Sequence, residues 1–199
     1  MVRFTKNKFD IYSIHFRNLK HKDKRKNMIV VGTTPGREHW LKDCIQSIHK
    51  ELLILSDYRY ELGKIKWCAE HLTNNFLFLQ DSVILKETLW IDKLFAKNKS
   101  IALFNDPAIY GTYMGIYEPL ILKTMDIPIP QNKAEAVYFE IEWTKKYAEK
   151  AQNVEIAFPD VTDAKSTKKE LRYGRLNLVL ENEYLIKYKG NWGQKPLLD

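Results

Sequence analysis

Three apolar runs in the first half of the chain end in side chains that could bind a polar ligand. Thr33 and Thr34 close the first run, Asp57 follows the second, and Asp81 follows the third. A carboxylate at the end of a buried strand is costly unless something binds it, so Asp81 is a candidate ligand-binding residue. Capping the following helix is the alternative role for Asp81, and an ordinary turn is the alternative for Asp57.

The elements that must position these residues alternate along the chain. Short β-branched or apolar runs predict buried strands, and between them apolar residues three and four apart predict amphipathic helices. The predicted strands are 28–33, 51–56, 76–79 and 101–104, and the predicted helices are 38–49, 62–72 and 89–95. This order predicts an α/β fold with a Rossmann-like, mostly parallel sheet flanked by helices. Ligands of such sheets bind outside the carboxyl ends of the strands, where the polar residues stand.

The second half of the chain has a looser pattern. The segment 110–117 is rich in aromatic residues and glycine and predicts a strand or a loop that faces a cleft. Residues 132–152 predict the longest helix, in which Asn132 and Glu135 form a variant of the capping box. A strand is predicted over 154–158, a loop over 159–173, and a C-terminal hairpin over 176–188, although a helix remains open for its first half.

Aromatic side chains in this half could form a platform for an acceptor, because aromatic faces stack on sugars and bases. The candidates are Tyr110, Tyr113, Tyr117 and Trp192, with core packing as the alternative.

The net charge of +7 is concentrated in an N-terminal arm. Residues 1–27 hold nine of the 32 Lys/Arg and two of the 25 Asp/Glu, which leaves 23 of each sign in residues 28–199. The chain therefore divides into a basic arm, 1–27, and a single domain, 28–199. The arm could bind DNA or another polyanion through phosphate contacts, or it could be a solvated leader. Its apolar residues between Phe9 and Phe16 predict a strand or short helix packed on the domain.

Composition excludes several classes of protein. No run approaches 18 apolar residues, so no membrane-spanning helix is expected, and the first residues lack the apolar core of a signal peptide. Cys44 and Cys68 form no metal-binding spacing and suit a reducing, cytoplasmic setting as buried free thiols.

The order of these elements resembles the glycosyltransferases of the GT-A fold, specifically the family 2-like group, over about residues 28–160. The segment 29–37 resembles the opening strand and its Pro and Arg turn, and 40–48 resembles the first helix. The segment 52–57 is similar to the strand that ends in a nucleotide-binding acid, and 76–83 stands where the family has its D-x-D motif. Asp81 is the one acid of that motif present, beside Gln80 and Ser82, and no histidine follows His71.

The resemblance implies roles for individual residues. The nucleotide would be bound by Thr33, Thr34, Arg37, Asp57, Lys64 and Asp81. Asp81 would hold Mn²⁺ or Mg²⁺, although a metal-independent site is the alternative. Arg37, Lys64 and Lys66 would neutralise the diphosphate. The alternatives are that Arg37 pairs with Glu38 or Asp43 and that Lys64 and Lys66 are solvated surface residues.

The resemblance also places a general base at the start of the helix after Asn132. Glu135 is the first candidate for this catalytic residue and Glu140 the second, with helix capping as the alternative for Glu135.

We therefore expect a small glycosyltransferase that uses a nucleoside-diphosphate sugar, UDP-linked, and a hydroxyl acceptor. The basic arm and small size suit a bacteriophage enzyme acting on modified bases in DNA, in the host cytoplasm. A saccharide or lipid-linked acceptor remains open. The alternatives are a sugar nucleotidyltransferase, for which 32–37 would be the phosphate loop, and a non-catalytic nucleic-acid-binding protein on the same scaffold.

Overall fold

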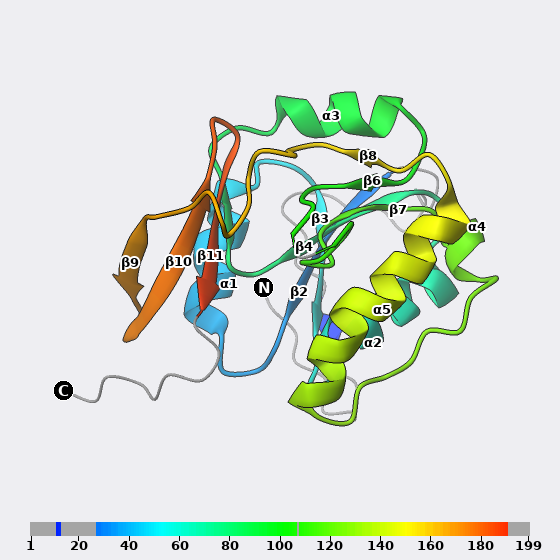
Figure 1. The fold of residues 1–199 in the computed structure, drawn as a ribbon, viewed down its shortest axis with the longest axis horizontal. Helices are drawn as coiled ribbons and strands as arrows, with labels where there is room; N and C mark the ends of the chain where they lie inside the picture. The colour runs from blue at the N-terminus through cyan, green and yellow to red at the C-terminus, as the bar shows by residue number, and fades with distance from the viewer. Residues whose placement is uncertain (1–10, 13–26, 107, 191–199) are drawn as a thin grey trace.

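A seven-stranded sheet forms the centre of the molecule (Figure 1). The computed structural model describes residues 11–12, 27–106 and 108–190. In spatial order the strands are β1 (Ile11–Tyr12), β3 (Leu52–Ser56), β2 (Met28–Thr33), β4 (Phe76–Gln80), β7 (Gly115–Tyr117), β6 (Ile101–Ala102) and β8 (Glu155–Ile156). Five of them run in one direction, while β1 and β7 run against their neighbours.

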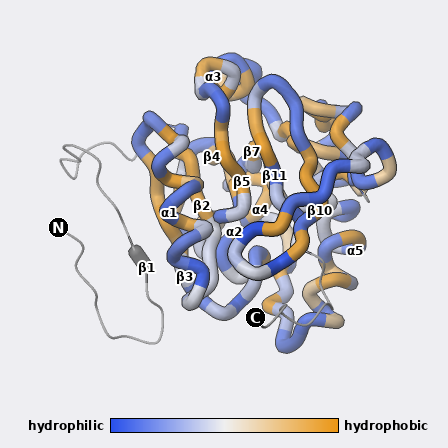
Figure 2. Tube along the Cα trace, turned by 90° about the vertical axis from the view of Figure 1, so that its left-hand side faces the viewer, coloured by the Kyte–Doolittle hydropathy of each residue, from blue (hydrophilic) through white to orange (hydrophobic). Residues whose placement is uncertain are grey.

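Helices cover both faces of this sheet. One face packs against α1 (Glu38–Ser47) and α3 (Leu89–Ala96). The other packs against α2 (Tyr60–His71), α4 (Pro119–Leu122) and α5 (Lys133–Ala151). Alternate residues of each strand serve the two layers, so that Ile29 and Val31 join the first core and Val30 the second. Figure 2 shows hydrophobic residues along the inner strands and alternating hydrophilic and hydrophobic segments along the helices.

A second, antiparallel sheet packs beside α1. Its strands are β5 (Val83–Leu85), β11 (Leu185–Gly190), β10 (Arg175–Glu181) and β9 (Lys169–Arg172), in that spatial order. Strands β10 and β11 form the predicted C-terminal hairpin, which excludes the helical alternative for its first half. Strand β5 begins two residues after Asp81, so this sheet brings the C-terminal hairpin to the carboxyl end of β4.

The architecture confirms the predicted α/β class, with a mostly parallel sheet between helices and an additional antiparallel sheet. The four early strands and three early helices form within a few residues of the predicted bounds. The prediction of a loop over 159–173 was wrong for Lys169–Arg172, which is β9, and β5 and α4 were not predicted. Within the described residues, no helix is both long and apolar enough to cross a membrane.

The aromatic segment belongs to the core and forms no platform. Tyr110, Tyr113 and Tyr117 are at most 3% exposed. The hydroxyl of Tyr110 donates to the Ile116 carbonyl and that of Tyr117 to the Tyr113 carbonyl, both at 2.8 Å. Burial raises the pKa of all three phenols, so each stays protonated in the interior. Trp192, the fourth member of the expected platform, lies outside the described residues.

Candidate functional site

The carboxyl ends of β2, β3 and β4 meet at one edge of the central sheet. The backbone N–H of Asp57 donates to the Thr33 carbonyl at 3.4 Å, and that of Asp81 donates to the Gly32 carbonyl at 3.1 Å. Gly32 leaves room for the Phe78 ring, since a Cβ at this position would lie 2.6 Å from it. The residues predicted from their positions after three strands are therefore neighbours in the folded chain.

Both oxygens of the buried Asp81 carboxylate are hydrogen-bonded at this edge. Asp81 is 4% exposed. One carboxylate oxygen accepts from the Thr33 hydroxyl at 2.7 Å and from Arg37 Nε at 2.7 Å, and the other accepts from Arg37 Nη2 at 2.6 Å. Arg37 thus pairs with Asp81, and the alternative expectation of a pair with Glu38 or Asp43 was wrong. Burial lowers the pKa of Arg37, but the hydrogen bonds and charge of Asp81 outweigh it and raise that pKa overall.

Arg37 is held by the loop that joins β2 to α1. Its backbone N–H donates to the Thr34 carbonyl at 3.2 Å, and Gly36 has a φ of +88°, which favours glycine. The guanidinium also lies 5.6 Å from the centre of the Trp40 ring, a cation–π contact. The side chain of Arg37 stays 32% exposed, so it can meet a ligand from solvent.

Lys187 is hydrogen-bonded to both residues that flank Asp81 in the sequence. It is a buried lysine of β11, and its amine donates to the Gln80 side-chain oxygen and, at 2.5 Å, to the Ser82 hydroxyl. Desolvation lowers the pKa of Lys187 to about 8, although the charge of Asp81 opposes this shift. The C-terminal hairpin therefore adds a second cation to the segment 80–82.

Asp57 is held by two cations of the following turn and helix. Its oxygens accept from Arg59 Nε at 3.0 Å and Nη2 at 2.7 Å, and Arg59 N–H donates at 2.8 Å. Lys64 is buried, which rules out its role as a solvated surface residue. The Lys64 amine lies 3.4 Å from an Asp57 oxygen and donates to the Tyr60 carbonyl at 2.9 Å. Asp57 therefore accepts a backbone hydrogen bond within the turn after β3, which is the alternative role expected from the sequence. Lys64 connects the start of α2 to the end of β3 through its contacts with Tyr60 and Asp57.

Glu61 of α2 and Glu140 of α5 form one side of the site. Glu61 of α2 accepts from the Gln80 amide at 2.9 Å, and its charge acts on Arg37 and on Glu140 of α5. Burial, and then the charge of Glu61, raise the pKa of Glu140 from 4.5 to about 7, against the lowering effect of Lys189 and Lys187. A half-buried carboxyl that titrates near neutral pH can accept a proton during a reaction.

Glu135 caps α5. Its backbone N–H donates to the Asn132 side-chain oxygen at 3.0 Å, and its carboxylate accepts from the Gln131 N–H at 2.8 Å and the Asn132 amide at 3.1 Å. The predicted cap is confirmed, with the return bond reaching Gln131 N–H as well as the Asn132 side chain. The geometry favours Glu140 over Glu135 for proton transfer.

The donor set at residues 80–82 does not fit a divalent cation. Arg37 and Thr33 occupy both oxygens of Asp81, and Lys187 occupies the side-chain oxygens of Gln80 and Ser82. Across the described part of the chain, no three His, Cys, Asp or Glu side chains come together as a metal-binding group. Mg²⁺ needs oxygens at about 2.0–2.1 Å in a near-octahedral arrangement, and the oxygens of residues 80–82 are already bonded to other groups of the chain.

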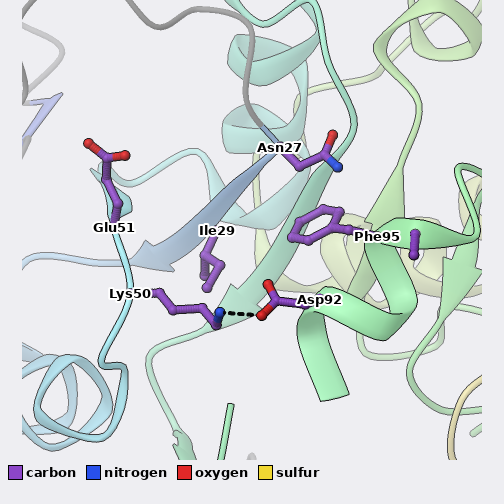
Figure 3. A pocket seen from close by; sticks show the side chains of 7 residues that line it. Asn27, Ile29, Lys50, Glu51, Asp92 and Phe95 are labelled. Atoms are coloured by element: carbon purple, nitrogen blue, oxygen red, sulfur yellow. Dashed lines mark hydrogen bonds and ion pairs between the residues drawn. The ribbon is translucent and has the colours of Figure 1, made fainter. Parts of the chain in front are cut away.

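A surface hollow of about 480 Å³ lies at the opposite edge of the sheet (Figure 3). Its lining consists of Ile29, residues just before β2 and β3, and residues of α3. Lys50, before β3, and Asp92, of α3, form an ion pair across it at 2.7 Å. Its lining comes from the amino ends of the strands. Apart from this ion pair its charged lining residue is the acid Glu51, which would repel a diphosphate, so we place no nucleotide site there.

Sequence reasoning missed three residues of the site, Tyr58, Arg59 and Glu61, and it singled out Lys187 only as part of the basic, aromatic segment 187–193, expected to close over the donor diphosphate. Tyr58 follows Asp57 and is 74% exposed. In the sequence it can be recognised only as an aromatic residue in a polar turn. Glu61 is an acid in the first turn of a helix, where the helix dipole alone explains it. The burial of Lys187 at an inward strand position gives no signal in one sequence. Residues 1–10 and 13–26 of the basic arm lie outside the described residues, and the described Ile11 and Tyr12 pair with β3.

No family model matches this sequence, and no curated protein matches it. A solved structure described as the crystal structure of A197 from STIV is similar, with a TM-score of 0.47 and 9% sequence identity. The match covers 85% of this chain and 97% of that one. A likeness of this strength carries no argument about function, which must come from the residues of the site.

Proposed function

We propose that the protein is a glycosyltransferase that moves a sugar from a nucleoside-diphosphate sugar to a hydroxyl group. The observation that carries the proposal is the half-buried carboxyl of Glu140, with its pKa raised to about 7, beside the strand-end residues. An acid of that pKa can accept the proton of an acceptor hydroxyl near neutral pH. The resemblance of segments 29–57 and 76–83 to GT-A glycosyltransferases supports the same reading.

The donor would bind across the carboxyl ends of β2, β3 and β4. The exposed ring of Tyr58 offers a face on which a base such as uracil can stack, and Asp57 and Arg59 offer hydrogen-bonding groups beside it. The diphosphate would lie against the loop Thr33–Arg37, where the exposed part of the Arg37 guanidinium is its cationic partner.

An inverting transfer proceeds by one displacement at the anomeric carbon. The Glu140 carboxylate takes the proton of the acceptor hydroxyl as its oxygen bonds to the anomeric carbon. The bond from that carbon to the diphosphate oxygen breaks, and its electron pair leaves with the nucleoside diphosphate. Cations beside the diphosphate stabilise the negative charge that develops there.

The acceptor that fits the basic arm best is a polyanion, and we propose a modified base in DNA, as in a bacteriophage. The arm carries the whole net charge of +7, whereas residues 28–199 are neutral by count. Phosphate contacts from such an arm would hold DNA by counterion release, independently of the sugar donor.

A thermal-shift panel followed by a hydrolysis assay tests the proposal. Nucleoside diphosphates and UDP-sugars should raise the melting temperature, since a ligand that binds the native state stabilises it. The full chain should then release nucleoside diphosphate slowly from the matching sugar nucleotide, and Glu140→Gln should abolish transfer while it retains the thermal shift. A protein that binds DNA but neither shifts with nor cleaves any sugar nucleotide would be the non-catalytic alternative.

A further inference from the structure

Residues 80–82 already hold two fixed cations where the family resemblance expects a metal ion. Arg37 spans both oxygens of Asp81 with two hydrogen bonds, at 2.7 and 2.6 Å. Lys187 bonds the side chains of Gln80 and Ser82. The partner of Asp81 comes from the loop between β2 and α1, and the partner of Gln80 and Ser82 comes from the C-terminal hairpin. The side-chain oxygens of Gln80, Asp81 and Ser82 all face a cation of the chain itself.

We infer that Arg37, positioned by Asp81 and backed by Lys187, neutralises the diphosphate of the nucleotide in place of a divalent metal ion. The inference rests on the proposed function, and it changes the part assigned to Asp81. Asp81 becomes a positioning residue that orients Arg37, and it does not ligate an ion.

The free donors of Arg37 suit this role. A guanidinium carries five N–H groups, and Asp81 takes two of them. The remaining three belong to a side chain that is about one-third exposed and lies in the loop before α1, so they can reach a ligand from solvent. Because Asp81 fixes the plane of the guanidinium, little conformational freedom remains to be lost when phosphate oxygens bind.

Lys187 acts through charge, without touching the ligand. It is 3% exposed and its amine is directed at Gln80 and Ser82. The strand-end group contains four cations, Arg37, Arg59, Lys64 and Lys187, and four acids, Asp57, Glu61, Asp81 and Glu140, so its net charge lies between zero and +1 as Glu140 titrates near pH 7. A buried cation below the site makes the edge attractive to an anion, since charges in a low-dielectric interior are poorly screened.

Binding of UDP and of Mn²⁺ alone to the full chain tests the inference. By titration calorimetry, the UDP dissociation constant should agree within about twofold in EDTA, in Mg²⁺ and in Mn²⁺. Arg37→Met should weaken UDP binding by about 10- to 100-fold, as expected for the loss of charge-assisted hydrogen bonds. Arg175→Met is the matched control, because Arg175 is an exposed arginine at the start of β10, and it should bind UDP like the parent.

The Mn²⁺ measurement separates this inference from the proposed function. Electron paramagnetic resonance of the wild-type chain with Mn²⁺ should show no stoichiometric site that Asp81→Asn removes. Such a site would overturn the inference whether or not UDP binds, and so would UDP binding that EDTA abolishes and Mn²⁺ restores. Failure of every nucleotide to bind would refute the proposed function and, with it, the cationic role of Arg37. If Arg37→Met does not fold, Arg37→Lys keeps the charge without the fork and should show intermediate affinity.

Discussion

Arg37 and Asp81 lie 44 residues apart in the chain and form a two-pronged ion pair at the carboxyl edge of the central sheet. The pair joins the loop after β2 to the end of β4, and the Thr33 hydroxyl completes it from β2. The carboxylate is buried and the guanidinium is partly open to solvent. One residue therefore fixes the other in a position from which it can meet an anion.

The pair should be visible as a coupling free energy. Arg37→Met leaves the Asp81 carboxylate buried without its main partner and should lower the free energy of unfolding by about 1–3 kcal/mol. Asp81→Asn should also destabilise the fold, and the double variant should cost less than the sum of the two. Urea denaturation of the four proteins measures the coupling. Effects that add to within about 0.5 kcal/mol would contradict the pairing.

Glu140 makes both stability and turnover depend on pH. Its pKa is raised to about 7 in the fold, so its contribution to stability is fully present below about pH 4.5 and is lost as the pH rises through 7. Glu140→Gln mimics the protonated acid and should exceed the wild type in stability by roughly 1–3 kcal/mol near pH 8.5, with no gain near pH 4.5. Denaturant titrations at both pH values provide the measurement.

The same titration should appear in the rate. Transfer by the wild-type chain should rise with pH through about 7 as the Glu140 carboxylate forms, and the Gln variant should lack transfer at every pH. Glu149→Gln, an exposed acid near the end of the same helix, serves as the control and should change neither profile. A Gln variant with wild-type turnover would remove Glu140 from the reaction.

Tyr58 should contribute to nucleotide affinity and little to stability. Its ring is 74% exposed, so Tyr58→Ala removes few contacts of the fold. Loss of a base-stacking face should weaken UDP binding by about 5- to 100-fold. Tyr138→Ala, at a tyrosine of α5 that is 60% exposed, is the matched control. Calorimetric titration of both variants decides the role, and equal affinities would assign the base to another surface.

The predicted strands and helices formed largely because their apolar periodicity reflects burial on two faces of one sheet. Val30 faces α2 while Ile29 and Val31 face α1. Because both faces of the strand are buried, its residues are apolar without interruption, and such a run predicts a strand of a parallel sheet. Strand β9 was missed because Lys169–Arg172 is an edge strand held by backbone pairing with β10, which leaves no hydrophobic pattern. Strand β5 has three residues, too few for any period.

The site was predictable only where strand ends position it. Asp57 and Asp81 could be found because parallel strands bring their carboxyl ends together. The Arg37–Asp81 pair, the Gln80–Glu61 bond and the burial of Lys187 depend on contacts between distant segments, which one sequence does not reveal. The expected aromatic platform was wrong for a related reason, since the hydroxyls of Tyr110 and Tyr117 donate to backbone carbonyls in the interior and both rings are buried there.

The basic arm should control binding to DNA and leave nucleotide binding unchanged. Changing Lys20, Lys22, Lys24, Arg25 and Lys26 to Gln removes five of its nine cations. If each contacts a phosphate, the slope of log affinity against log salt should flatten by about 0.9 per contact, which amounts to several units. Fluorescence anisotropy at several salt concentrations gives both slopes. An unchanged slope would make the arm a solvated leader and would remove the main support for a DNA acceptor.

The position of bound UDP is the decisive measurement for the proposed nucleotide site at the carboxyl ends of the strands. A structure of the full chain with UDP, or amide chemical-shift changes on titration with it, should place the diphosphate beside Arg37 and Asp81 and the base beside Tyr58. Binding in the hollow at the other edge of the sheet, with contacts to Ile29, Lys50 and Asp92, would contradict the account.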